Sequence, residues 1–122
     1  MAKKILIVDD EPSITVPLKF LMEQHQFEVV VVHNGEDALS VIKVFEPDLV
    51  ILDIMLPGLD GFQVCQTLKE DPARKLVKVI FLSAMTRDLD IAKGNTLGAD
   101  AYITKPFSNA DVVSLVKDLL SG

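Results

Sequence analysis

The chain contains a single cysteine, no tryptophan and only two histidines among its 122 residues. One cysteine excludes an intramolecular disulfide and a metal site built from several thiolates. We expect Cys65 to be a small buried apolar residue, because it lies at helical spacing from Phe62 and Leu68. The two histidines, His25 and His33, are poorly placed for a catalytic or metal-binding pair.

Positive charge and long apolar runs are also scarce. Twelve lysines and arginines stand against 18 acids, which gives a net charge of −6. Such a surface repels nucleic acid and anionic lipid, so we expect direct binding to neither. No apolar run approaches the roughly 20 residues of a membrane span, and none suits a signal peptide, so we expect a cytoplasmic protein. The length fits a single domain over 1–122.

Five short apolar runs alternate with segments of helical length. The expected strands are 5–8, 29–32, 49–52, 77–82 and 101–103. Uninterrupted apolar runs are typical of strands buried on both faces, and their alternation with helices predicts parallel strands joined by right-handed crossovers. The sequence therefore predicts an α/β, doubly wound, five-stranded parallel sheet. The helix expected over about 88–97 is the weakest, because Gly94 lies inside it at a cost of about 1 kcal/mol relative to Ala.

Polar residues follow the ends of these expected strands. Asp9 and Asp10 close the first, Asp53 closes the third, Ser83 the fourth, and Lys105 follows the fifth. Each alone is an ordinary turn residue, but ligands of doubly wound sheets bind beyond the carboxyl ends of the strands. Two carboxylates about 4 Å apart repel by roughly 4 kcal/mol at an effective dielectric near 20, so the three acids call for a cation. Oxygen ligands of this kind favour Mg²⁺.

These motifs resemble the receiver domain of two-component response regulators, of the kind found in chemotaxis regulators. The resemblance covers the whole chain and is carried by four segments: Asp9-Asp10-Glu11, Asp53 with residues 54–61, Ser83-Ala84 and Lys105-Pro106-Phe107. It implies a flavodoxin-like (βα)5 fold with strand order 2-1-3-4-5. It also implies a phosphorylation-controlled signalling switch, which is no enzyme beyond its own phosphorylation and dephosphorylation.

The resemblance further implies the role of each site residue. Asp53 would accept a phosphoryl group from a phosphohistidine of a sensor histidine kinase or of a histidine phosphotransfer protein. Lys105 would pair with a phosphoryl oxygen. Mg²⁺, or Mn²⁺, would be held by Asp10, Asp53 and the backbone carbonyl of Met55, with Asp9 acting through a water.

Two residues would carry the switch in this resemblance. The hydroxyl of Ser83 would donate to the phosphoryl group, and Tyr102 would turn inward behind it as a shift in population. The Lys105–Pro106 peptide bond is expected to be cis. The fourth helix, fifth strand and fifth helix would then present a changed surface to a downstream effector or to a second copy of the chain.

Two apolar residues border the site in the sequence. Met55 and Met85 each lie two positions beyond a site residue, Asp53 and Ser83. Neither can hydrogen-bond an attacking water, so we expect slow self-dephosphorylation.

Two other functions use similar residues. A phosphatase with an aspartate nucleophile also needs strand-end acids and Mg²⁺, but usually in an Asp-x-Asp arrangement, whereas Asp9 and Asp10 are adjacent. A flavodoxin-like cofactor binder would need a phosphate-binding loop after the first strand, where acids stand instead. Repeated turnover of a phosphate ester would identify the phosphatase.

Overall fold

The computed structural model describes residues 2–84 and 88–121, with strands and helices in strict alternation. In chain order they are β1 (Lys4–Val8), α1 (Pro12–Gln24), β2 (Glu28–Val32), α2 (Gly35–Phe45), β3 (Leu49–Asp53), α3 (Gly61–Glu70), β4 (Lys78–Ser83), α4 (Asp88–Thr96), β5 (Ala101–Thr104) and α5 (Asn109–Leu120). All five expected strands are present, and their ends fall within one residue of the predicted ones.

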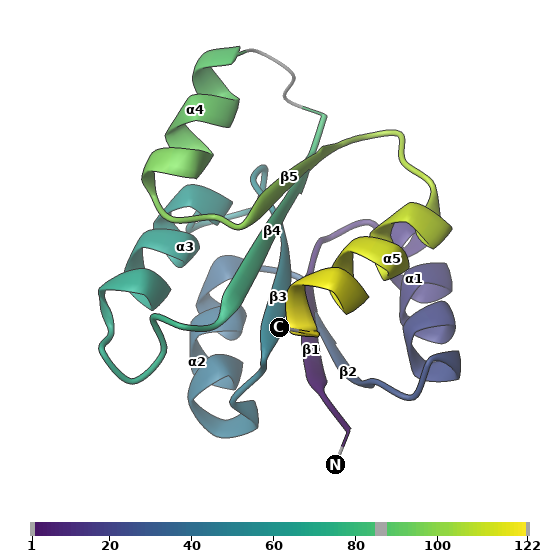
Figure 1. The fold of residues 1–122 in the computed structure, drawn as a ribbon. Coiled ribbons are helices and arrows are strands. Elements are labelled where there is room, and N and C mark those ends of the chain that lie inside the picture. The colour runs from purple at the N-terminus through teal and green to yellow at the C-terminus, as the bar shows by residue number, and fades with distance from the viewer. Residues whose placement is uncertain (1, 85–87, 122) are drawn as a thin grey trace.

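The five strands form one parallel sheet in the order β2-β1-β3-β4-β5. Helices α2, α3 and α4 cover one face of the sheet, and α1 and α5 cover the other (Figure 1). This arrangement confirms the doubly wound fold and its strand order. Within the described ranges, the helices are too short or too polar to cross a membrane.

The core has two layers, one on each side of the sheet. Successive side chains of β1 alternate between them: Leu6 and Val8 pack toward α2 and α3, whereas Ile5 and Ile7 pack toward α1 and α5. All four side chains are fully buried. The same holds along β3 and β4, which explains why these strands read as continuous apolar runs.

Gly94 has a packing role inside α4. A Cβ at this position would lie 3.0 Å from the ring of Phe81 on β4 and 3.5 Å from the ring of Tyr102 on β5. The absence of a side chain lets α4 approach the sheet closely. From the sequence, Gly94 could be recognised only as a residue that weakens the helix. Its packing against Phe81 and Tyr102 depends on the tertiary fold and is not visible in the local pattern.

Cys65 lies on the buried face of α3 and is fully buried, as expected. Burial raises the pKa of its thiol to about 11. The reactive thiolate is therefore disfavoured, and Cys65 is a core residue.

Candidate functional site

The polar residues singled out in the sequence meet at the carboxyl edge of the sheet. Asp53 and Ser83 are the last residues of β3 and β4, while Asp9 and Lys105 directly follow β1 and β5. The register pairs Ser83 with Thr104, so the ends of β4 and β5 lie level. Parallel pairing thus brings together residues that are far apart in the chain.

Asp53 lies at the centre of this group and is 3% exposed. Its Oδ1 accepts a hydrogen bond from the backbone N–H of Met55 at 3.2 Å, and its Oδ2 lies 3.3 Å from Lys105 Nζ. Burial raises the pKa of Asp53, the charge of Asp9 raises it further, and Lys105 offsets only part of this. The ionised form of Asp53 is therefore disfavoured by its surroundings, and a further cation would stabilise it.

Asp9 is buried beside it, with 1% of the residue exposed. Its Oδ1 accepts from the backbone N–H of Glu11 at 2.9 Å. Its Oδ2 forms an ion pair with Lys105 Nζ at 3.1 Å but accepts no well-aligned hydrogen bond from any described residue. The Asp9 carbonyl lies 3.0 Å from Nδ1 of His33, a contact that the sequence did not predict. One buried carboxylate oxygen thus keeps lone pairs for another partner.

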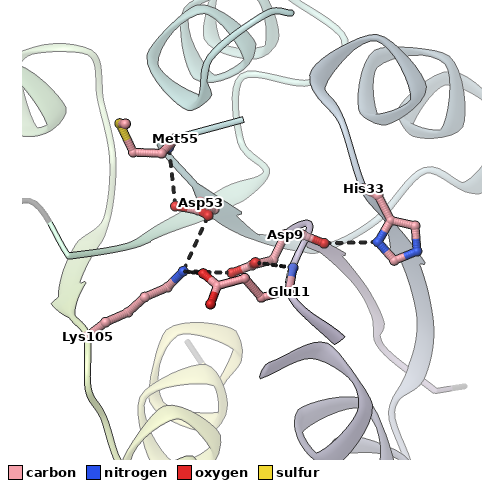
Figure 2. A network of polar contacts seen from close by, with 6 residues as sticks. All are labelled: Asp9, Glu11, His33, Asp53, Met55 and Lys105. Carbon is pink, nitrogen blue, oxygen red and sulfur yellow. Dashed lines mark hydrogen bonds and ion pairs between the residues drawn. The ribbon is translucent and has the colours of Figure 1, made fainter. Parts of the chain in front are cut away.

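Lys105 binds three carboxylates at once. Its Nζ lies 3.0 Å from Glu11 Oε1, 3.1 Å from Asp9 Oδ2 and 3.3 Å from Asp53 Oδ2 (Figure 2). Burial by itself would lower the pKa of Lys105, but the neighbouring carboxylates of Glu11, Asp9 and Asp53 outweigh it and raise that pKa. The ammonium is therefore a permanent cation. The Lys105–Pro106 peptide bond that follows is cis.

The acids form a cluster that suits a divalent cation. One carboxylate oxygen from each of Asp9, Asp10, Glu11 and Asp53 lies within 4.8 Å of the others. Four carboxylates exceed the single ammonium of Lys105, and the buried Asp9 Oδ2 has capacity to spare. Oxygen donors of this kind fit Mg²⁺ or Mn²⁺. The sequence had predicted three of these acids and had given Glu11 no role.

Asp10, Met55, Phe62 and Lys93 are among the residues that line an open depression of about 510 Å³ beside the cluster. The Lys93 ammonium lies 4.6 Å from the centre of the Phe62 ring, so α4 contacts α3 here. The Met55 side chain is 66% exposed. Met85, the second apolar residue expected near the site, lies outside the described residues.

The two expected switch residues, Ser83 and Tyr102, lie on the adjacent strands β4 and β5. Ser83 is fully buried at the end of β4. Tyr102 on β5 is half-buried, and its ring centre lies 6.1 Å from that of Phe81, which in turn packs edge-on against Phe62 at 5.3 Å. A series of aromatic contacts therefore connects β5 to α3 through β4.

Known proteins resemble this chain in sequence and in fold. The family described as "Response regulator receiver domain" matches residues 5–117. The alkaline phosphatase synthesis transcriptional regulatory protein PhoP of Bacillus subtilis is 42% identical over 120 residues, which are 98% of this chain and 49% of PhoP. The chain thus spans about half the length of this curated relative.

Two solved structures are similar over nearly the whole chain. The signal receiver domain of a signal transduction histidine kinase from Syntrophus aciditrophicus has a TM-score of 0.91 at 36% identity, with 99% of this chain and 92% of that one covered. The response regulator DrrB, a Thermotoga maritima OmpR/PhoB homologue, has a TM-score of 0.89 at 34% identity, with 99% and 54% covered.

The family match decides between the functions that the sequence left open. Receiver domains are phosphorylation-regulated signalling modules that bind Mg²⁺ in an acidic pocket, and this structure has an acidic cluster of Asp9, Asp10, Glu11 and Asp53. Neither a phosphatase nor a cofactor-binding flavodoxin is indicated. The chain belongs to the response regulator receiver domain family.

Proposed function

We propose that this receiver domain accepts a phosphoryl group on Asp53 from a phosphohistidine, carried by a sensor histidine kinase or by a histidine phosphotransfer protein. One observation carries the proposal: the Asp53 carboxylate lies at the open edge of the sheet with the Lys105 ammonium 3.3 Å away. A carboxylate can attack phosphorus directly when a fixed cation offsets the charge of the transferred oxygens.

The transfer exchanges one bond for another. An Asp53 carboxylate oxygen forms a bond to phosphorus as the P–N bond of the donor breaks. The bonding pair returns to the imidazole ring of the donor, which takes up a proton from solvent. Met55 N–H holds Oδ1 of Asp53, which fixes the orientation of the nucleophile. Lys105 then pairs with a phosphoryl oxygen as a compact charge.

The proposed cofactor is Mg²⁺, with Mn²⁺ as a substitute. Asp10, Asp53 and the Met55 carbonyl would hold it directly, and Asp9 would act through a water. When bound, the cation would offset negative charge on the phosphoryl oxygens. Asp9 is suited to its part, because one of its oxygens is fixed by Glu11 N–H while the other accepts no well-aligned bond from the described residues.

The phosphoryl group adds a charge of about −1.5 to −2, which the fold must convert into a changed surface. We propose that the Ser83 hydroxyl donates to it and that Tyr102 moves with Ser83. Tyr102 packs on Phe81, and the rings of both residues lie so close to Gly94 that a Cβ there would be 3.0 Å from Phe81 and 3.5 Å from Tyr102, so such movement would reach α4. The surface of α4, β5 and α5 would then bind a downstream effector or a second copy of the chain.

Intact mass spectrometry after treatment with acetyl phosphate tests the site. Wild-type protein should gain one phosphoryl group with Mg²⁺ and none with EDTA, and Asp53→Asn should gain none. Asp37→Asn, at an exposed acid of α2, is the matched control and should be labelled normally. Equal labelling of Asp53→Asn, with peptide mapping that excludes rerouting, would overturn the assignment.

Hydrogen exchange with and without beryllofluoride, a phosphoryl mimic, tests the output surface. Protection should change most in α4 and β5, and less in α1 and α2. A largest change in α1 would move the output surface to that helix.

A further inference from the structure

Glu11 stands at an unusual place for a glutamate, the N-cap of α1. Such positions favour Ser, Thr, Asp or Asn, whose short side chains bond to the first turn of the helix. Asn34, Asp60 and Ser108 cap α2, α3 and α5 in this way. Glu11 makes no capping bond with its side chain. The first turn of α1 thus gives up a local stabilising contact.

The Glu11 side chain instead reaches Lys105, 94 positions further along the chain. Its Oε1 lies 3.0 Å from Lys105 Nζ, the shortest of the three carboxylate contacts of that ammonium. Figure 2 shows the Glu11 carboxylate beside the Lys105 nitrogen, next to Asp9 and Asp53. The cation that the proposed function assigns to the phosphoryl group is therefore already bound by a residue with no part in the transfer.

Three carboxylates surround the Lys105 ammonium within 3.3 Å: Glu11 and Asp53 accept hydrogen bonds from it, and Asp9 forms an ion pair with it. A phosphoryl oxygen that approaches Lys105 therefore competes with these carboxylates for the ammonium. Asp9 and Asp53 are buried, and each is also held by a backbone N–H. Glu11 is long and its side chain is 53% exposed, so it is the partner that is most easily displaced.

We propose that Glu11 is a positioning residue whose carboxylate competes with the phosphoryl group for Lys105. In the resting site it holds the ammonium. Phosphorylation must displace it, so Glu11 lowers the affinity of the site for a phosphoryl group and sets the balance between the two states. This inference rests on the proposed function and specifies how the equilibrium of that site is adjusted.

Two variants separate competition from simple charge repulsion. Glu11→Gln removes the charge and keeps the length. Glu11→Asp keeps the charge but shortens the side chain by one carbon–carbon bond, roughly 1.5 Å, which breaks the 3.0 Å contact with Lys105. Glu23→Gln is the matched control, because Glu23 lies on the same helix and pairs with Lys19 at the same distance of 3.0 Å, away from the site.

The experiment is an NMR titration with beryllofluoride at saturating Mg²⁺. Glu11→Gln and Glu11→Asp should both bind roughly two- to fivefold more tightly than wild type, the range expected for a partly exposed ion pair. Glu23→Gln should bind as wild type does. In the resting protein, both Glu11 variants should also shift the side-chain resonances of Lys105, which a purely structural role of Glu11 in α1 would leave in place.

Three results would overturn the proposal. If Glu11→Asp binds beryllofluoride as wild type does while Glu11→Gln binds it more tightly, the effect comes from the negative charge near the site and not from the contact with Lys105. Unchanged affinity in both would remove any role for Glu11. Weaker binding in both would mean that Glu11 aims Lys105 at the phosphoryl group. No beryllofluoride binding by wild-type protein would overturn the proposed function itself, and this inference with it.

Discussion

Asp9 and Asp53 bury their carboxylates side by side at the ends of the adjacent strands β1 and β3, with 1% and 3% of each residue exposed. Burial raises the pKa of Asp53, and the charge of Asp9 adds to the effect. Lys105 opposes both but does not cancel them. The metal-free fold is therefore destabilised by the ionised form of Asp53.

Asp53→Asn should raise the free energy of unfolding of the metal-free protein at neutral pH, by an amount on the order of 1 kcal/mol. The pKa of Asp53 is higher in the folded state than in the unfolded state. Asp53 therefore lowers the free energy of unfolding in full at a pH above its pKa in the folded state, and it has no such effect at a pH below its pKa in the unfolded state. The difference between variant and wild type should shrink as the pH falls through the folded pKa toward the unfolded one.

Urea unfolding in EDTA at neutral and acidic pH measures this difference. Asp118→Asn, at an exposed acid of α5, should change stability by less than about 0.5 kcal/mol. An Asp53→Asn protein that is less stable than wild type at neutral pH would contradict the argument.

Asp10→Ala should weaken Mg²⁺ binding more than Asp9→Ala, by roughly tenfold or more. Asp10 is exposed at the cluster and is proposed as a direct ligand. Asp9 already pairs with Lys105 and is proposed to act through water. NMR shifts followed during Mg²⁺ titration give both affinities. If Asp9→Ala loses more affinity, the two roles are reversed.

Met55→Asn, combined with Met85→Glu, should speed loss of the phosphoryl group roughly tenfold, equivalent to about 1.4 kcal/mol of barrier. Met55 is 66% exposed beside Asp53 and offers no side-chain hydrogen bond to an attacking water. Met55→Leu retains the apolar character and should keep the wild-type lifetime. Decay of the phosphorylated mass with time is the measurement, and an unchanged half-life in the double variant would refute the hypothesis.

Cys65 should resist thiol reagents in the folded protein. Its pKa of about 11 leaves on the order of one thiolate in a thousand at about pH 8, and the side chain is fully buried. The rate at which a thiol reagent modifies Cys65, measured by absorbance, should be slow in buffer and fast in denaturant. This rate therefore reports how often the fold opens around Cys65. Fast labelling under native conditions would mean that the α3 layer opens readily.

Gly61→Ala should destabilise the fold more than Gly94→Ala. A Cβ at position 61 would lie 2.3 Å from the carbonyl oxygen of Asp53, a backbone atom that cannot move aside, so a loss of about 1–3 kcal/mol is expected. At position 94 the nearest atom belongs to the Phe81 ring, and the helix gains about 1 kcal/mol from Ala. Urea unfolding of the two variants compares them directly, and a larger loss at Gly94 would contradict this account.

The strands could be predicted because they depend on local pattern, whereas their order in the sheet followed from the resemblance to receiver domains. Buried parallel strands are continuous apolar runs, and the acids that end them mark the edge of the sheet. Asp9, Asp53 and Lys105 were singled out on this basis, and the fold brings them into contact.

The rest depends on distances between segments that no local pattern records. Glu11 follows two site acids in the sequence, but its contact with Lys105 spans 94 positions. The only local indication that Glu11 has a partner elsewhere was the presence of a glutamate at a helix N-cap. Gly94 in α4 and the Lys93–Phe62 contact are similar cases, because each is explained by a neighbour on another element.

The placement of the site at strand ends has a consequence for redesign of the protein. The central strands are fixed by two buried layers, and the polar cluster lies at their carboxyl ends. Among the described contacts of Asp9, Asp53 and Lys105, the partners come from strand ends and the loops that follow them. Recognition surfaces on the helices can therefore be rewritten for new partners while the strand ends stay untouched. The same scaffold can in this way serve as an interchangeable input module, provided that the ends of β1, β3, β4 and β5 are transferred as a set.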